Sequence, residues 1–320
     1  MTLNKQCRVG VIGAGYLGKF HAEKYANLST AELVAVCDTH EAARHLVASH
    51  WGAEAISDYR ELIGKVEAVS IVTPTTLHHE IALFFLNHGV HVLVEKPITV
   101  TLVEAQELVK AAQEKQLILQ VGHLEQFNPV IQALKPLVRT PRLIEAFRLA
   151  PFTPRGADVN VVLDLMIHDI ELVQSMMRAP IESISASGMP VITADIDVAN
   201  ARLNFSNGAV AYLTASRVHE SLEREMTVFQ EDGFISLDLQ SKQWVHHKTM
   251  EEESYPGVKK IVREKQQFDR GDALKSQIVA FLDAILHQQS VLVSGEAGQQ
   301  ALATAIAITD IIRSNQMAFA

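Results

Sequence analysis

The sequence is poor in cysteine and contains no long apolar run. Its 320 residues include two cysteines, Cys7 and Cys37, which fall in apolar, strand-like segments and outside any metal-binding spacing. We therefore expect both thiols to be reduced core residues, and we expect no metal site. No apolar stretch approaches the roughly 20 residues needed to cross a bilayer, and the N-terminal segment lacks the apolar core of a signal peptide. These absences predict a cytoplasmic protein with no membrane partner.

Positive charge is also scarce. Lysine and arginine total 28 residues against 37 aspartates and glutamates, which gives a net charge of −9 at pH 7. A surface of this sign does not suit non-specific binding to nucleic acid, so we expect no nucleic-acid partner. Apolar residues make up 48% of the chain and charged residues 20%, as in ordinary globular proteins. A globular chain of 320 residues is expected to form two domains.

Strand-like and helix-like segments alternate over the first third of the chain. Short β-branched strands that alternate with helices predict a parallel sheet with helices on both faces, which is the α/β Rossmann fold. We expect this domain to span residues 1–122. The expected strands are Cys7–Ile12, Leu33–Cys37, Ala68–Val72, His91–Val94 and Ile118–Val121, and the expected helices are Lys19–Leu28, Glu41–Ser49, Leu77–Asn87 and Leu102–Glu114.

The pattern changes in residues 123–320, where several alternating strands follow one another. Asn207-Gly208 and Asp232-Gly233 are typical of two-residue hairpin turns, so we expect an α+β domain with a large, mostly antiparallel, open sheet. The expected strands are Leu143–Leu149, Ile184–Ser187, Ala199–Phe205, Val210–Ser216, Glu225–Gln230 and Ile235–Leu239, and the expected helices are Val130–Leu137, Asn160–Met177, Ala273–Leu286 and Gly298–Ser314.

Small residues recur on one face of this second sheet and would leave it flat. Such a face suits either a contact between subunits or tight helix packing, and the sequence does not choose between them. The residues are Ala199, Ala201, Ala209, Ala211 and Ala215.

A glycine motif joins the first expected strand to the first expected helix. In GAGYLG, residues 13–18, Gly13 permits a tight turn, Gly15 lets the backbone approach a pyrophosphate, and Gly18 lets the helix pack closely on the strand. Asp38 ends the second strand, where a carboxylate can accept hydrogen bonds from an adenosine ribose and would repel the 2′-phosphate of NADP. A structural glycine turn is the alternative, but the flanking elements and Asp38 together predict an NAD site.

Two further motifs end strands of the parallel sheet, at the edge where ligands bind. Thr73-Pro74-Thr75 ends one strand and precedes His78, which lies either beside the ligand or in a first helical turn facing water. Glu95-Lys96-Pro97 ends the next strand. Lys96 is either a desolvated proton-transfer group in the crevice or a solvated surface lysine.

The expected helix Asn160–Met177 is apolar nearly all round except for one polar stripe. At about 100° per residue the stripe contains Asp164, His168, Glu171 and Ser175. Asp164 and His168 are four residues apart, so the carboxylate can hold the imidazole basic and oriented at a polar cavity. Alternatively His168 is a satisfied core histidine, or Asp164 pairs with an arginine such as Arg148 or Arg202.

These segments together resemble the glucose–fructose oxidoreductase/inositol dehydrogenase/MocA (Gfo/Idh/MocA) family. The matching pieces are VIGAGYLGKFHA, TPTTLHHEIA, VEKP and DLMIH, and they occur in the family's order over essentially the whole chain. The resemblance implies a Rossmann domain followed by an open sheet that forms homodimers or homotetramers. By resemblance, Lys96, Asp164 and His168 match the family's catalytic lysine, aspartate and histidine.

The resemblance also implies contacts around the reacting groups. Tyr16, Leu17 and Glu95 are expected at the cofactor, and Glu125 and Asn128, in GHLEQFNP, at the substrate. This segment and those around the DLMIH helix are most similar to bacterial family members that act on UDP-sugars. Two departures from the family pattern are Gln126, where many members have arginine, and the absence of a GGG run before the helix.

The function expected from these residues is NAD-dependent oxidation of a sugar hydroxyl. Arg155, in the loop before the helix, is the candidate for a UDP pyrophosphate, although a surface arginine after a proline is equally expected. Three alternatives remain: a dehydrogenase of inositol or another unactivated sugar, an NAD-using glycosidase, and a non-enzymatic sensor of NAD and sugar. Retention of Lys96, Asp164 and His168 together argues against the sensor.

Overall fold

The structure of the protein, a computed structural model, describes residues 6–154, 159–269 and 271–317. The chain forms two compact units, and each is described by itself. Unit 1 comprises Met1–Phe127 and Asp272–Leu302, and unit 2 comprises Asn128–Gly271 and Ala303–Ala320.

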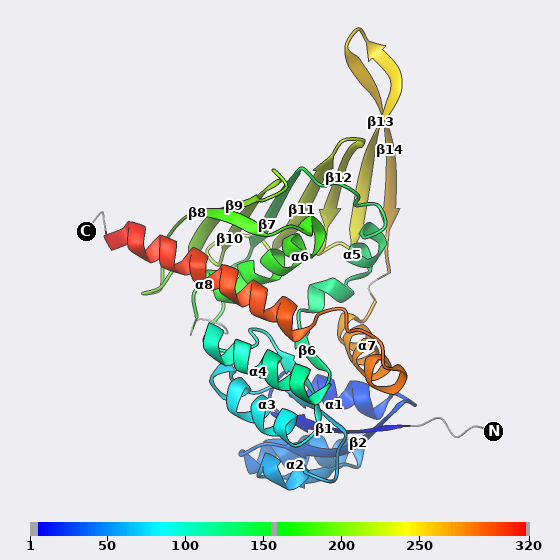
Figure 1. Cartoon of the computed structure of the whole chain (residues 1–320), viewed down its shortest axis with the longest axis vertical. Helices are drawn as coiled ribbons and strands as arrows, with labels where there is room; N and C mark the ends of the chain where they lie inside the picture. Colours follow the sequence, from blue (N-terminus) through cyan, green and yellow to red (C-terminus); the bar gives the residue numbers. More distant parts are fainter. Residues whose placement is uncertain (1–5, 155–158, 270, 318–320) are drawn as a thin grey trace, which may run out of the picture. The chain divides into compact units, whose positions relative to one another are not determined.

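Unit 1 contains a six-stranded sheet in the order β3-β2-β1-β4-β5-β6, and every pair of neighbours is parallel (Figure 1). This arrangement confirms the predicted Rossmann fold. The strands are β1 (Cys7–Ile12), β2 (Ala31–Cys37), β3 (Glu54–Ile56), β4 (Ala68–Ile71), β5 (His91–Glu95) and β6 (Leu119–Gly122). The helices are α1 (Gly18–Ala26), α2 (Glu41–Trp51), α3 (His78–Asn87), α4 (Leu102–Lys115) and α7 (Ala273–His287), with short 3-10 turns η1 (Tyr59–Leu62), η2 (Thr75–Leu77) and η3 (Leu124–Phe127).

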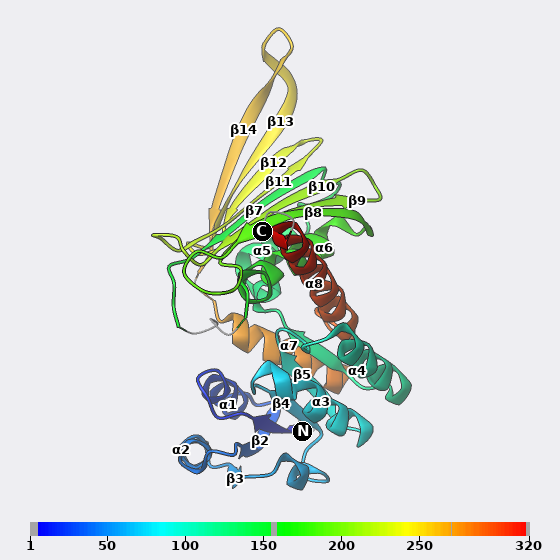
Figure 2. The same ribbon diagram turned by 90° about the vertical axis from the view of Figure 1, so that its left-hand side faces the viewer.

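Helices cover both faces of the parallel sheet. Figure 2 shows α1 and α2 on one side of it and α3 and α4 on the other. Cys7 and Cys37 are both buried thiols, as expected. The three-residue strand β3 was not predicted, because so short a segment carries no detectable alternation.

Residues 272–302 belong to unit 1, although they follow the whole of the second sheet. The α7 residues Ile278, Phe281 and Leu282 are buried in one apolar cluster with residues of β1 and α1. A Cβ at Gly298 would lie 2.5 Å from a Val121 side-chain atom, so a glycine lets this segment approach β6. The predicted division between residues 122 and 123 placed this segment in the second domain. The hydrophobic periodicity of a helix does not show which of two units the helix packs against.

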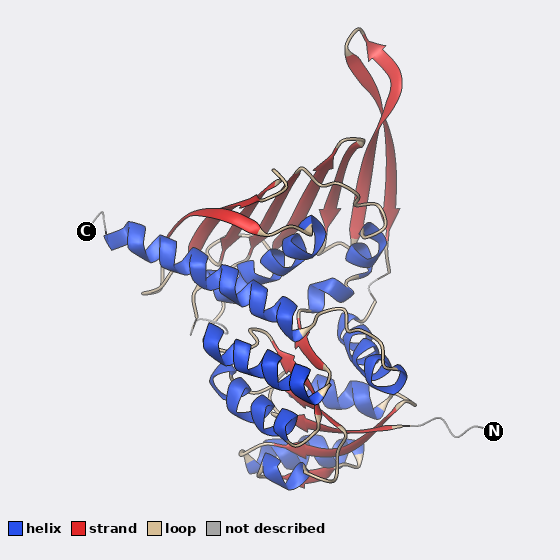
Figure 3. Ribbon diagram, in the orientation of Figure 1, coloured by secondary structure: helices blue, strands red, loops and turns tan. Residues whose placement is uncertain are grey.

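Unit 2 contains an eight-stranded sheet in the order β14-β13-β12-β11-β7-β10-β9-β8 (Figure 3). Its described neighbours are antiparallel except for the parallel pair β7 and β10, which confirms the predicted mostly antiparallel sheet. The strands are β7 (Leu143–Leu149), β8 (Ile181–Met189), β9 (Val198–Phe205), β10 (Val210–Ser216), β11 (Glu223–Gln230), β12 (Gly233–Asp238), β13 (Gln243–Tyr255) and β14 (Val258–Gln267). The helices are α5 (Pro129–Leu134), the π-helical turn η4 (Val162–Met166) and α6 (Ile167–Met177), while α8 (Gly295–Met317) begins in unit 1 and ends in unit 2.

One face of the eight-stranded sheet packs on helices. η4 and α6 contact β10, and α6 also contacts β7. The five alanines of the flat face are at most 4% exposed, so within unit 2 they serve helix packing rather than a subunit contact. On the opposite face, Phe147 is 42% exposed and Tyr212 is 44% exposed.

A hairpin of β13 and β14 extends beyond the rest of the sheet (Figures 1 and 3). Gly233 at the start of β12 pairs with Lys248, so residues 249–261 lie past the end of that strand. The sequence did not predict either strand, because charged residues follow one another along 251–253 and 259–260 without alternation.

Candidate active site

The glycine loop lies between β1 and α1 in unit 1. Gly13 has a φ of 101°, and a Cβ there would lie 2.5 Å from the Val72 carbonyl oxygen, so the turn requires glycine. A Cβ at Gly18 would overlap the Gly13 carbonyl, whereas a Cβ at Gly15 would meet no atom within 4 Å. Leu17 occupies the N-cap of α1 with an aliphatic side chain that cannot cap, and Tyr16 is exposed. Open space beside the backbone at a helix N-terminus fits a bound pyrophosphate.

Asp38 is held against this loop. Its Oδ2 accepts a hydrogen bond from Ala14 N at 2.6 Å and its Oδ1 accepts one from His40 N at 2.8 Å. Arg44 donates to the carbonyl oxygens of Asp38 and Thr39 at 3.4 and 3.2 Å. The carboxylate is thus fixed beside the glycine loop, and its contact with a ribose stays a prediction.

A pocket of about 330 Å³ opens at the carboxyl ends of β1, β2 and β4. The strand order reverses at β1, and ligands of such sheets bind at this reversal. Of the predicted cofactor residues, Gly13, Gly15, Asp38, Thr73 and Pro74 line the pocket. The remaining lining residues are Ile12, Cys37, Thr39, Ser57, Tyr59, Val72, Leu77, Glu80 and Ile81.

Four polar lining residues were missed by the sequence analysis: Thr39, Ser57, Tyr59 and Glu80. Tyr59 donates a hydrogen bond from its hydroxyl to Glu80 Oε1 at 2.7 Å, and Arg60 Nη2 donates to the same oxygen at 3.2 Å. Burial and the Glu80 bond raise the pKa of Tyr59 to about 12, so the hydroxyl stays a donor. Ser57 and Tyr59 follow the unpredicted β3, and recognition of that strand was the signal needed to find them.

His78 joins two segments of the predicted cofactor site. Its Nδ1 lies 2.9 Å from the Pro97 carbonyl oxygen and its Nε2 lies 3.0 Å from that of Thr73. The side chain is buried, and burial lowers its pKa. His78 therefore does not face water; it ties the turn after β4 to the segment after β5. Thr75, in η2, is half-buried.

Glu95 is a buried carboxylate next to Lys96. His21 Nε2 lies 3.2 Å from Glu95 Oε1, and a Cβ at Gly122 would lie 2.8 Å from the carboxyl atoms, so the group is enclosed. Burial alone would raise the pKa of Glu95, but the bond to His21 and the nearby charges of His21, His78 and Lys96 lower it. The carboxylate is therefore ionised beside the half-buried Lys96. The sequence analysis did not single out His21, whose only signal is its place on the buried side of α1.

The GHLEQFNP segment, residues 122–129, begins at the end of β6. His123 is buried, and burial together with the charge of Lys96 lowers its pKa to about 3, so it is neutral. Glu125 and Gln126 are buried in η3. Asn128, in unit 2, caps α5 by accepting from Val130 N at 3.2 Å and donates to the Leu239 carbonyl oxygen at 3.4 Å. Substrate contacts of Glu125 and Asn128 remain predictions.

Asp164 and His168 lie where the π-helical turn η4 gives way to α6 in unit 2. Asn160 caps the start of η4 by accepting hydrogen bonds from Val162 N and Leu163 N at 3.0 and 3.1 Å. Asp164 and His168 are both half-buried. π-Helical turns occur frequently at functional sites.

The predicted four-residue polar stripe does not extend past His168. Both Glu171 and Ser175 lie in α6, where Glu171 is buried and Ser175 is exposed, so the four residues do not share one polar environment. Arg148, a suggested partner of Asp164, forms a buried two-point ion pair with Asp169 at 2.8 and 2.9 Å. Arg202 lies on the exposed face of β9, with its guanidinium 5.6 Å from the Tyr212 ring centre.

Arg155 lies outside the described residues, so its predicted contact with a pyrophosphate stays a prediction.

Among the residues that are described, no group of three or more His, Cys, Asp or Glu side chains could hold a metal ion. No helix in the described parts of the chain combines the length and the apolar character needed to cross a membrane.

Two family models match the sequence. Residues 7–123 match the model described as an oxidoreductase family with an NAD-binding Rossmann fold (GFO_IDH_MocA), and residues 146–236 match the GFO/IDH/MocA C-terminal domain. Together the two models cover the glycine loop, Lys96, Asp164 and His168.

Known proteins are similar along nearly the whole chain. UDP-N-acetylglucosamine 3-dehydrogenase of Acidithiobacillus ferrooxidans is 39% identical over 94% of this chain and 96% of its own. Myo-inositol 2-dehydrogenase of Thermotoga maritima is 26% identical over 92% and 93%. The solved structure of the Acidithiobacillus enzyme matches with a TM-score of 0.90 at 36% identity, covering 97% of this chain and 98% of that chain. Scyllo-inositol dehydrogenase of Lactobacillus casei, solved with NAD(H) and scyllo-inositol, shares the fold with a TM-score of 0.81 at 22% identity, covering 97% and 98%.

Proposed function

The chain belongs to the Gfo/Idh/MocA family of oxidoreductases and is an NAD-dependent dehydrogenase, and we propose from this premise that it oxidises the 3-hydroxyl of UDP-N-acetylglucosamine. The observation that carries the proposal is 39% identity, over 94% of the chain, to an enzyme with that name. The product is then the 3-keto sugar nucleotide, which we assign to the formation of lipid A precursors in the cytoplasm.

We assign the cofactor to the glycine loop and the pocket of unit 1. Gly13, Gly15 and Gly18, with Tyr16 and Leu17, hold the pyrophosphate, and Asp38 accepts hydrogen bonds from the adenosine ribose. Thr73, Pro74, Thr75, His78, Glu95 and Lys96 form the wall toward the nicotinamide. Bound NAD supplies the acceptor for the hydride that leaves the sugar carbon.

We assign proton transfer to His168. As a general base it accepts the proton of the reacting hydroxyl, Asp164 orients the imidazole, and Lys96 donates a hydrogen bond to the same oxygen. Two observations support the roles in unit 2: Asp164 and His168 are both half-buried, while the residues on either side of His168 are buried. A base needs such partial access, because it must touch substrate and still be desolvated.

Substrate contacts are assigned to Glu125, Asn128 and Arg155. An arginine suits the UDP pyrophosphate because its planar guanidinium binds phosphate oxygens at two points. We also propose that the protein is a homodimer or homotetramer built through the exposed face of the eight-stranded sheet, since Phe147 and Tyr212 are large apolar residues exposed there.

The test is NADH formation over a panel of UDP-sugars and free sugars. We expect net NADH with UDP-N-acetylglucosamine and a loss of about a hundredfold or more in kcat for His168→Asn, because a proton-transfer group is removed. Ser175→Ala is the control, since Ser175 is exposed on the same helix and its hydroxyl donates to Leu172 O at 2.7 Å. Turnover of free inositol or glucose alone would reject the nucleotide-sugar assignment, and sugar cleavage without net NADH would identify a glycosidase.

A second measurement tests whether Lys96 and His168 act on one oxygen. We expect the double variant Lys96→Met/His168→Asn to be far less impaired than the product of the two single effects, because groups that act as a unit are non-additive. Independent, multiplicative losses would contradict the shared role.

A further inference from the structure

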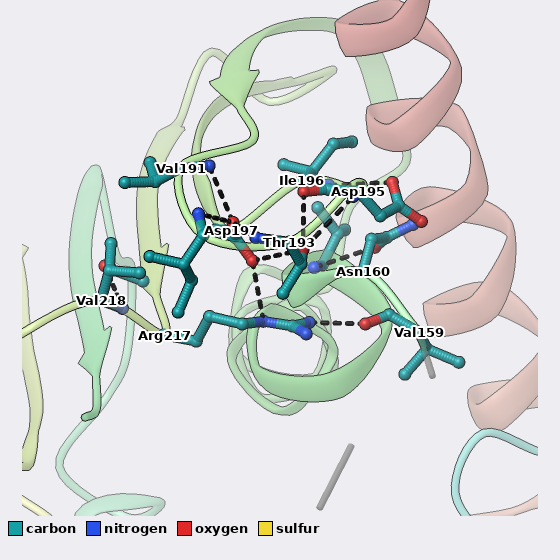
Figure 4. A network of polar contacts seen from close by, with 12 residues as sticks. Val159, Asn160, Val191, Thr193, Asp195, Ile196, Asp197, Arg217 and Val218 are labelled. Atoms are coloured by element: carbon teal, nitrogen blue, oxygen red, sulfur yellow. Dashed lines mark hydrogen bonds and ion pairs between the residues drawn. The ribbon is translucent and has the colours of Figure 1, made fainter. Parts of the chain in front are cut away.

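A buried carboxylate outside the proposed reacting groups organises the loop between β8 and β9. Asp197 is fully buried in unit 2, and one of its carboxylate oxygens accepts hydrogen bonds from Val191 N, Ile192 N and Thr193 N at 2.7, 2.7 and 2.8 Å. The other oxygen accepts from Thr193 Oγ1 at 2.7 Å. Figure 4 shows these bonds converging on one side chain. Burial alone would raise the pKa of Asp197, but these donors lower it to about 2, so the group is ionised.

Arg217 connects this carboxylate to the helix that carries Asp164 and His168. Its Nε lies 3.8 Å from Asp197 Oδ1, and its Nη2 donates a hydrogen bond to the Val159 carbonyl oxygen at 2.6 Å (Figure 4). Arg217 follows the end of β10 and is itself buried. The buried pair of Asp197 and Arg217 is therefore hydrogen-bonded to Val159, which lies just before η4 in the sequence.

Further bonds fix the same short segment. Val161 N donates to the Ile196 carbonyl oxygen at 3.0 Å, so the loop ordered by Asp197 pairs with the chain just before η4. Asn160 caps η4 and donates from Nδ2 to Thr309 Oγ1 of α8 at 3.5 Å. Arg313 of α8 binds Asp195 of the loop at 3.1 Å. Residues 159–161 are thus held from the sheet, from the loop and from α8.

A buried charged pair is by itself weak evidence for a purely stabilising role, because packed apolar residues of similar volume often stabilise a protein as well. The pair also has a direction: the hydrogen bond from Arg217 fixes the Val159 carbonyl, three residues before η4 begins at Val162. We propose that Asp197 and Arg217 are positioning residues, which fix the start of η4 so that Asp164 and His168 keep the orientation needed for sugar oxidation. The inference rests on the proposed function of Asp164 and His168.

Three variants test it in the full-length protein. Arg217→Met keeps the length of the side chain and removes the donors; Asp197→Asn replaces one acceptor oxygen with a donor that faces N–H groups. Arg217→Lys keeps the charge. We expect the first two to lower kcat for UDP-N-acetylglucosamine by at least about tenfold, since small displacements of reacting groups have effects of this size. The Kd for NAD should stay within about twofold, because its residues lie in unit 1, and Arg217→Lys should recover part of kcat.

The control separates positioning from stability. Val228→Ala removes a fully buried side chain on β11, in the same unit and away from η4, and lowers the melting temperature through a cavity. Its kcat should remain within about twofold of wild type. If Arg217→Met does not fold, Thr193→Val removes one donor to Asp197 and keeps both charges, and a smaller loss of kcat is expected. Wild-type kcat in Arg217→Met and Asp197→Asn, or in Thr193→Val where Arg217→Met does not fold, overturns the inference.

A readout without substrate distinguishes failure of this inference from failure of the proposed function. In spectra of protein with ¹⁵N-labelled histidine, His168 is assigned by its absence in His168→Asn. We expect its ring resonances to shift or broaden in Arg217→Met and Asp197→Asn and to stay in place in Val228→Ala. Unchanged resonances in the first two variants refute the positioning role. Shifted resonances in a protein that oxidises no sugar of the panel keep that role and reject the function.

Discussion

The three glycines of the cofactor loop differ in what surrounds them, and the difference separates folding from binding. At Gly13 the left-handed backbone and the nearby Val72 oxygen leave no room for a side chain, whereas the space beside Gly15 is open. Open space beside a loop glycine at a helix N-terminus is what a bound pyrophosphate requires.

We therefore expect Gly15→Ala to fold normally and to bind NAD at least about tenfold more weakly, a loss of about 1.4 kcal/mol or more. Fluorescence titration with NADH and thermal melting measure the two properties. Gly13→Ala is the contrast, because strain at a positive φ should lower its melting temperature. Wild-type affinity in Gly15→Ala would mean that no phosphate lies against this residue.

Asp197 predicts a dependence of stability on pH. Its pKa is about 2 in the folded protein against 3.8 for an ordinary aspartate, so the ionised group stabilises the folded state. A depressed folded pKa gives stabilisation that is complete above the unfolded value and disappears as the pH falls through the folded value. The free energy of unfolding should therefore be higher in wild type than in Asp197→Asn by roughly 2 kcal/mol near pH 6, with the difference shrinking between about pH 4 and pH 2. Urea unfolding at several pH values measures it, and a difference that does not change with pH would contradict the ionised state.

At the scale of elements, strict periodicity decided what the sequence predicted. β10 has the predicted bounds because the buried residues Ala211, Leu213 and Ala215 alternate along it with Tyr212 and Thr214. The same rule missed β13 and β14, whose distal halves are exposed on both faces and so carry no alternation. η4 was missed for another reason, since a uniform turn of about 100° per residue was assumed and a π-helical turn is wider.

Parts of the candidate site were predictable where a short local motif, such as a glycine loop, requires a particular residue type at a strand end. Gly13, Gly15, Asp38 and Thr73 follow strand ends and line one pocket. His21 and Arg217 were not predictable, because their roles depend on partners 74 residues away in Glu95 and 58 residues away in Val159. Pairings between residues so distant in sequence leave no local pattern.

The distal part of the β13–β14 hairpin offers a prediction about an element. Thr249 pairs with Ile261, so replacing residues 250–260 with Asn-Gly closes the two strands with a two-residue turn. The removed residues are exposed, and an isolated two-stranded ribbon contributes little stability. We expect the melting temperature to change by less than about 2 °C and kcat to stay within about twofold. A change of mass in solution would show that the hairpin contacts a second copy of the chain, and a large loss of melting temperature or kcat at unchanged mass would show a role within one chain.

At the scale of the whole molecule, the proposed cofactor residues and the proposed base belong to different units of one chain. Residues 272–302 return to unit 1 after the second sheet is complete, so neither unit is a single continuous segment. Unit 1 therefore includes a segment that follows the second sheet, and no cut near residue 122 separates two complete units.

The exposed face of the second sheet carries the last prediction, which concerns assembly. Phe147 on β7 pairs with Thr214 on β10, two residues from Tyr212, so the two aromatic side chains lie on adjacent strands of that face. A self-complementary contact between copies would bury both, and two carboxylates placed there would be desolvated without partners. We expect wild type to have the mass of a dimer or tetramer by light scattering and Phe147→Glu/Tyr212→Glu to have a lower mass. Leu46→Glu is the control, because Leu46 is 73% exposed on α2 in unit 1 and the same charge there should leave the mass unchanged. An unchanged mass in the double variant would mean that this face of the sheet is not the interface.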